Sequence, residues 1–224
     1  MDASYLGDVF TRVVKLTSRW SSEQARCEAM LVALAEFHGR LAHLADDGSA
    51  SATPSTSVLG ADGHALLRAR HVRGVENLME ALQSSWKKFE TVQGELSDLH
   101  ASLWQRHETL LKEHHKASSS SEASQSSAAA FEQPTWSIVG AGRGLDAQPV
   151  GLPPVTECID NVRELDAQYA AELLLKFELL ESIDVTMPAD ALQGVVRLWN
   201  LQPNLAPLAL QRAVSLAQSL TLPT

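Results

Sequence analysis

The chain has 224 residues, of which 45% are hydrophobic but only 5% are aromatic, and its formal net charge at pH 7 is −9. This negative charge argues against a protein that binds nucleic acid directly, because phosphate contacts need clustered Lys and Arg. Cys27 and Cys158 are the only cysteines, too few for a disulfide framework or a cysteine zinc site. We expect neither a signal peptide nor a membrane span, and therefore a soluble protein of a reducing, intracellular compartment.

The first predicted element covers the N-terminal region. From Leu6 to Leu44 the apolar residues recur at alternating spacings of three and four, which indicates a helix with a heptad seam. The seam positions are Leu6, Phe10, Val13, Trp20, Cys27, Leu31, Leu34 and Leu41, interrupted by Thr17, Gln24 and His38. Residues 45–63 are rich in Gly, Ser, Thr and Pro and are predicted to be a flexible loop.

A second, longer seam follows this loop. Its positions are Val75, Leu78, Leu82, Ser85, Phe89, Val92, Leu96, Leu99, Leu103, Arg106 and Leu110. A seam sustained over about five heptads is typical of a coiled coil. It is about 50 Å long at ~1.5 Å per residue, so it needs an equally long partner. The first helix is the obvious one, which predicts a helical hairpin over residues 4–116; a partner protein is the alternative. Trp86 and Trp104, next to the seam, are interpreted as packing residues.

Residues 117–154 are rich in Ser, Gly and Pro and are predicted to form a disordered linker. Within it, the stretch SIVGAGRGLD (138–147) raises the question of a nucleotide-binding turn. A dinucleotide fingerprint needs glycine at its first, third and sixth positions, between a strand and a helix. Gly140 and Gly142 fit, but the sixth position is Leu145 and prolines follow. We interpret the stretch as linker, which argues against a nucleotide-binding enzyme.

No other catalytic, cofactor-binding or metal-binding set is expected. His100, His107 and His114 recur every seven residues. That spacing is roughly 10 Å along a helix, too far apart for one metal ion. No Ser/His/Asp or Cys/His arrangement stands in a recognisable motif. The sequence therefore favours a protein that is not an enzyme and needs no cofactor.

Two candidate phosphorylation sites lie in the predicted unstructured segments. Thr53 precedes a proline in the loop, and Ser124 precedes a glutamine in the linker, as checkpoint kinases prefer. A phosphate at either site would add nearly two negative charges and could gate a partner without changing the fold.

Helical periodicity resumes over residues 155–222. The first C-terminal helix is expected to bury the stripe Val155, Ile159, Val162, Leu165, Tyr169, Leu173, Phe177, Leu180 and Ile183. A shorter helix begins near Pro188, and a last one is entered through Asn204 and Pro207. The predicted fold class is thus all-α: a long antiparallel helical hairpin or coiled coil, then a small C-terminal helical bundle.

The C-terminal segment, YAAELLLKFELLESI and later RLWNLQPNL, resembles the cyclin-dependent kinase 2-interacting protein family over residues 160–205. Tyr169, Glu172 and Lys176 fit its Tyr-x-x-Glu-Leu-Leu-Leu-Lys helix. Trp199 with Gln202-Pro203 fits its Trp-x-x-Gln-Pro ending.

The resemblance implies a non-enzymatic adaptor of the nucleus, with an additional cytoplasmic location left open. The implied partners are a cyclin-dependent kinase, a checkpoint kinase complex reached through its interacting partner, AAA+ ATPase subunits and a small helical ribosome-maturation factor. The implied processes are DNA replication, checkpoint signalling, replisome turnover and ribosome maturation. Direct binding to nucleic acid or membranes is not expected, and self-association is left open.

The matching residues form the predicted partner-binding set: Tyr169, Glu172, Lys176, Trp199, Gln202 and Pro203. Glu172 and Lys176, four residues apart, share a helix face as an exposed pair worth only about 0.3–0.5 kcal/mol. Such a pair serves either partner recognition or solvation of the outer face. Trp199 is either a core anchor or an interface hot spot.

Two alternatives remain beside this adaptor. A related small helical family, the ribosome-maturation factor that works with the same ATPase assembly, shares the style of first helix seen from Trp20 to Cys27. The other is a purely structural coiled-coil subunit of a kinetochore, tethering or cytoskeletal complex.

Overall fold

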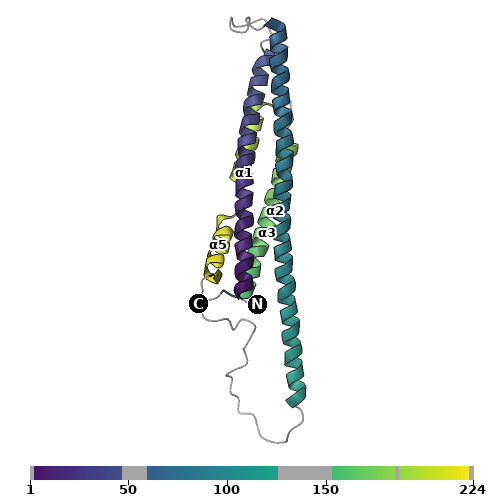
Figure 1. Ribbon diagram of the computed structural model, residues 1–224, viewed down its shortest axis with the longest axis vertical. Coiled ribbons are helices and arrows are strands. Elements are labelled where there is room, and N and C mark those ends of the chain that lie inside the picture. The colour runs from purple at the N-terminus through teal and green to yellow at the C-terminus, as the bar shows by residue number, and fades with distance from the viewer. Residues whose placement is uncertain (1–2, 47–59, 126–152, 185–186, 222–224) are drawn as a thin grey trace. The chain divides into compact units, whose positions relative to one another are not determined.

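The computed structural model describes residues 3–46, 60–125, 153–184 and 187–221, and within these ranges it contains five α-helices and no strand. In chain order these are α1 (Ala3–Asp46), α2 (Gly60–Gln125), α3 (Val155–Glu181), α4 (Ala189–Leu201) and α5 (Pro207–Thr221), as Figure 1 shows. The all-α prediction is confirmed.

The predicted loop and linker lie largely outside the described residues. Thr53 and the stretch 138–147 both fall there. The second helix, however, continues beyond residue 116, where we expected the linker to begin, and ends at Gln125. Ser124 therefore lies in the last turn of α2, and its side chain is outside the described part of the chain.

The helices form two compact units, and α1, α2 and α3 each contribute to both. The first unit takes Met1–Lys15, Glu95–Asp166 and Pro207–Thr224, and the second takes Leu16–Gly94 and Ala167–Ala206. Each unit thus combines both N-terminal helices with α3 and one further helix, α5 in the first unit and α4 in the second.

Within the second unit, ring contacts show that α1 and α2 are antiparallel. The ring centroids of Trp20 and Phe89 are 4.5 Å apart, while those of Phe37 and His71 are 5.5 Å apart. A later residue of α1 thus meets an earlier residue of α2. In the first unit, the Arg106 guanidinium lies 4.1 Å from the ring centroid of Tyr5, which again joins early α1 to late α2.

The two predicted seams form most of the core on these helices. The seam residues that are at most 3% exposed are Leu6, Phe10, Val13, Trp20, Cys27, Leu31 and Leu34 on α1, and Val75, Leu82, Ser85, Phe89, Val92, Leu96, Leu99 and Leu103 on α2. Burying such side chains is the main favourable term in folding. The exceptions lie toward the ends of the seams: Leu41, Leu78 and Leu110 are only half-buried, and Arg106 is exposed.

The expected apolar stripe of α3 is confirmed from Val155 to Tyr169 and again at Ile183, but not at Leu173, Phe177 and Leu180 between them. Glu172 and Lys176 are completely buried, whereas Phe177 is 41% exposed and Leu173 is only half-buried. Between Tyr169 and Ile183 the buried face therefore carries Glu172, Lys176 and Leu179 in place of Leu173, Phe177 and Leu180.

In the first unit, α5 packs against the start of α1 (Figure 1). A Cβ atom added at Gly7 would lie 3.3 Å from the carbonyl oxygen of Leu220, so glycine permits this close approach. Asn161 of α3 donates a hydrogen bond from Nδ2 to the carbonyl oxygen of Ala209, at 3.1 Å. This bond holds the first half of α3 beside α5.

Candidate functional site

The interior of the second unit contains a buried ion pair. Lys176 and Glu172 are both 0% exposed, and Lys176 Nζ lies 3.1 Å from Glu172 Oε1. Nζ also donates a hydrogen bond to the carbonyl oxygen of Trp199 at 3.2 Å, and it lies 4.2 Å from the centroid of the Trp199 ring. A buried ammonium group is tolerated only when such partners replace its water.

Two further side chains complete this group, which we call the Lys176 cluster: Gln24, Glu172, Lys176, Trp199 and Asn204. Gln24 Nε2, on α1, donates to the same carbonyl oxygen of Trp199 at 2.8 Å. The backbone N–H and the side-chain Nδ2 of Asn204 each donate to Glu172 Oε2 at 3.3 Å. The cluster therefore ties α1, α3 and the end of α4 together.

Aromatic rings of the same unit form a chain of contacts that reaches Trp199 of the cluster. Trp20 makes edge contacts with Phe89 and with Tyr169, at centroid distances of 4.5 and 4.9 Å. Phe89 in turn contacts Trp199 at 6.1 Å. Burial lowers the pKa of Lys176, and the nearby Glu172 carboxylate only partly opposes that effect.

These contacts explain why the buried face of α3 carries Glu172 and Lys176 after Tyr169. Inward placement lets Glu172 and Lys176 form an ion pair with each other and hydrogen bonds to backbone groups at the end of α4, which leucine or phenylalanine could not do. Leu174 has no polar group with which to form such bonds, and it stays at the surface, 59% exposed.

Four of the six residues predicted to bind a partner belong to this interior. Tyr169 is 3% exposed, and Glu172, Lys176 and Trp199 are 0% exposed. The expectation that Glu172 and Lys176 form an exposed pair on an outer face is corrected, because tertiary contacts bury both. For Trp199, the burial agrees with the core-anchor interpretation.

The remaining two residues, Gln202 and Pro203, end α4. Gln202 is the C-cap in the left-handed conformation, with φ 42° and ψ 57°, and is the one non-glycine residue with positive φ in the described ranges. Its carbonyl oxygen accepts a hydrogen bond from the N–H of Leu205 at 3.0 Å. Gln202 is half-buried and Pro203 exposed, and their binding to a partner stays a prediction.

Chemically, the Lys176 cluster fixes the packing of three helices. Neither it nor any other described part of the chain brings together three or more His, Cys, Asp or Glu side chains that could hold a metal ion. Nor does any helix among the described residues have the length and apolarity to span a membrane.

Both cysteines are inaccessible thiols. Cys27 is 1% exposed and Cys158 is 0% exposed, and burial raises the pKa of each to about 11. Because alkylation requires an exposed thiolate, we expect iodoacetamide at about pH 8 to label the folded chain at least about 100-fold more slowly than the urea-unfolded chain. Mass spectrometry of timed samples measures both rates. Equal rates in the two states would contradict the burial.

Of the two tryptophans that we interpreted as packing residues, Trp86 and Trp104, only the first has that role. Trp86 is a packing residue as expected, since it is half-buried and contacts Phe177 at a centroid distance of 5.4 Å. Trp104, however, is 55% exposed on the first unit. Its position directly after the seam residue Leu103 is the only sign of this in the sequence, since a helix turns about 100° per residue.

Comparison with known proteins gives one family. No curated protein matches the chain. A family described as "Ribosome biogenesis protein C1orf109-like" matches residues 3–131, which include all of α1 and α2.

This match overturns the resemblance to the cyclin-dependent kinase 2-interacting protein family. The residues that carried the resemblance, within 160–205, are explained by packing around Lys176 and by the end of α4. The links to the replisome and to particular kinase partners rested on that resemblance, and apart from it only the candidate phosphorylation sites Thr53 and Ser124 point to kinases. The first-helix segment from Trp20 to Cys27, which favoured the ribosome-maturation alternative, lies inside the matched range. The chain belongs to the ribosome biogenesis protein C1orf109-like family.

Proposed function

We propose that this protein acts in ribosome maturation as a non-enzymatic helical subunit that binds protein partners. The observation that carries the proposal is the family match over residues 3–131, more than half of the chain. In finer detail, we propose that an AAA+ ATPase assembly is the partner and that the protein works in the nucleus or nucleolus.

The character of the matched region supports a binding role. It consists of two long helices whose seam residues are taken up by the core of the two units. Outside the seams, both helices also carry exposed side chains. Trp104 stands out among them, because an exposed tryptophan is the side chain most enriched at the energetic centre of protein interfaces.

The direct test uses the tagged full-length protein expressed in its own cells. We expect it to co-sediment with precursor ribosomal particles in a sucrose gradient, and its depletion to cause precursor rRNA to accumulate. Mass spectrometry of the purified complex should identify AAA+ ATPase subunits. Sedimentation only with cytoskeletal or kinetochore proteins, together with unchanged rRNA processing, would overturn the ribosome-maturation role.

The Trp104→Ala variant tests the surface. Because Trp104 is 55% exposed, we expect the free energy of unfolding to change by less than about 1 kcal/mol. Recovery of partners should nevertheless fall about tenfold, as for a hot-spot residue. Leu174→Ala is the matched control, since Leu174 is 59% exposed but lies outside residues 3–131. Equal recovery with both variants would remove Trp104 from the interface.

A further inference from the structure

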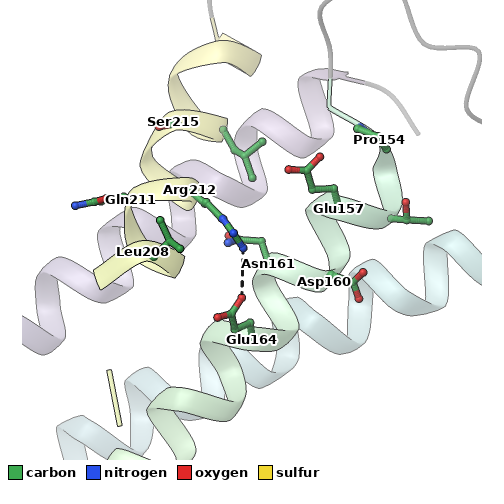
Figure 2. A pocket seen from close by; sticks show the side chains of 11 residues that line it. Pro154, Glu157, Asp160, Asn161, Glu164, Leu208, Gln211, Arg212 and Ser215 are labelled. Carbon is green, nitrogen blue, oxygen red and sulfur yellow. Dashed lines mark ion pairs between the residues drawn. The ribbon is translucent and has the colours of Figure 1, made fainter. Parts of the chain in front are cut away.

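A groove lies between the first half of α3 and α5 in the first unit, with a volume of about 560 Å³ (Figure 2). Its charged lining consists of three carboxylates, Glu157, Asp160 and Glu164, and one cation, Arg212. The groove therefore has an excess of negative charge. It lies outside the residues matched by the family, so a binding role for the groove does not depend on the role in ribosome maturation.

The carboxylates differ in how far they are neutralised. Arg212 Nη1 lies 3.8 Å from Glu164 Oε2 across the groove, as the dashed line in Figure 2 shows. Asp160 Oδ1 lies 3.0 Å from Nη2 of Arg163 on the same helix. Glu157 is exposed and forms no ion pair with any residue that the structure describes. It lies in the first turn of α3, where the helix N-terminus offsets only part of its negative charge, at one end of the groove.

Asn161, in the wall of the groove, provides the second observation. Its side chain is 4% exposed, its Nδ2 is engaged by Ala209, and its Oδ1 has no hydrogen-bond partner in the protein. A buried acceptor without a partner costs about 1–3 kcal/mol. Because this oxygen has almost no accessible surface, a hydrogen-bond donor that enters the groove reaches it only when a neighbouring side chain moves aside, and it would then remove that cost.

The α5 side of the groove supplies apolar surface. Leu208 lines it and is 57% exposed. The Arg212 side chain, beside it in Figure 2, is 55% exposed and can rotate to admit a ligand. An aliphatic stem with a cationic end matches this combination, because such side chains lay their methylene groups on apolar surface while the charge meets carboxylates.

We propose that this groove binds an arginine side chain in a basic segment of a partner protein. A planar guanidinium group has five N–H donors, so it can bond to the Asn161 amide oxygen and to a carboxylate at the same time. The span from Glu157 to Glu164 is about 10 Å along α3, which suits a peptide segment rather than a single small cation.

The test uses the purified full-length chain and fluorescein-labelled peptides composed of Arg, Leu and Ala, with binding followed by fluorescence anisotropy. We expect the Arg peptide to bind, and a peptide with citrulline in place of Arg to bind at least about tenfold more weakly, because citrulline keeps the shape but not the charge. A lysine peptide should be intermediate, since ammonium lacks the planar fork. Equal binding of the citrulline peptide, or no binding of the Arg peptide, would overturn the proposal.

Variants locate the binding in the groove. Glu157→Gln should weaken the Arg peptide about tenfold, and Arg212→Gln should tighten it about threefold because it removes a competing cation. Loss of the fold could not tighten peptide binding, so the effect expected for Arg212→Gln cannot come from unfolding. Glu178→Gln, an equal charge change at an exposed position of α3 in the second unit, is the matched control. An effect of Glu178→Gln equal to that of Glu157→Gln would show attraction by net charge alone and would refute the groove as the site.

Further outcomes separate the groove from the role in ribosome maturation. If Glu157→Gln abolishes peptide binding while the variant still co-sediments with precursor ribosomal particles, both proposals stand and the groove serves another contact. If the Arg peptide does not bind but co-sedimentation is intact, only the groove proposal fails. If analytical ultracentrifugation shows that Glu157→Gln instead dissociates a dimer of this chain, the occupant is a second copy and the proposed partner is wrong.

Discussion

Replacing Lys176 by methionine is expected to lower the free energy of unfolding by about 3–5 kcal/mol, the cost of leaving one member of a buried ion pair alone. The methionine retains most of the aliphatic volume, so little of the loss would come from a cavity. It comes instead from Glu172, whose carboxylate stays 0% exposed and keeps only the two hydrogen bonds from Asn204. Urea unfolding followed by circular dichroism measures the change.

A double replacement distinguishes the cost of leaving one buried charge unpaired from the cost of changing the two side chains. In Glu172→Leu/Lys176→Met both charges are gone, and we expect most of the lost stability to return, since an apolar pair of similar volume is often neutral or stabilising. The matched control is Lys112→Met, which breaks the exposed ion pair between Lys112 and Glu108 at the same spacing of four. It should change stability by no more than about 0.5 kcal/mol. Equal effects at Lys176 and Lys112 would contradict the burial.

The same pair predicts a pH dependence. Burial lowers the pKa of Lys176 in the folded state below the ordinary value of 10.5. Between the two pKa values the unfolded chain binds the proton and the folded chain does not, so stability rises with pH across the range just below 10.5. The Lys176→Met variant lacks this contribution. The stability of the wild type relative to the variant should therefore increase as the pH approaches 10.5, and a decrease would contradict the assigned direction.

Truncating Trp199 to alanine is expected to lower the free energy of unfolding by about 3–5 kcal/mol, as for large buried aromatic residues. Trp199 is 0% exposed, and its ring contacts Phe89 and lies against the ammonium of Lys176. Its loss therefore leaves a cavity and also weakens the support of a buried charge. Trp199→Phe should cost less, because it keeps most of the apolar volume and removes an indole N–H that is buried without a protein partner.

Trp104→Ala is the control for this variant, since it removes the same side chain from a position that is 55% exposed. The pair of variants distinguishes the two interpretations of Trp199. A core anchor loses stability on truncation, and its partners are lost only as far as the fold is lost. A change of less than about 1 kcal/mol on Trp199→Ala, with partners lost from a folded protein, would make it an interface residue instead.

The candidate groove could not have been found from the sequence. Glu157, Asp160 and Glu164 look like an ordinary solvated face of a helix, and Leu208 and Arg212 are separated from them by more than 40 residues of chain. Only the packing of α5 beside α3 places the two sets on opposite walls. The burial of Asn161, whose Nδ2 donates to Ala209 and whose Oδ1 has no protein partner, likewise depends on this packing.

The sequence by itself determined the helical class and most of the core of α1 and α2. A heptad seam from Leu6 to Leu34 and from Val75 to Leu103 leaves few other ways to bury so much aliphatic surface, because its spacing suits only a helix beside another helix. Tertiary structure decided the inward face of α3. There the local pattern favoured Leu173 and Phe177, but the fold buried Glu172 and Lys176, which from that face hydrogen-bond to the backbone carbonyl of Trp199 and to the N–H groups of Asn204.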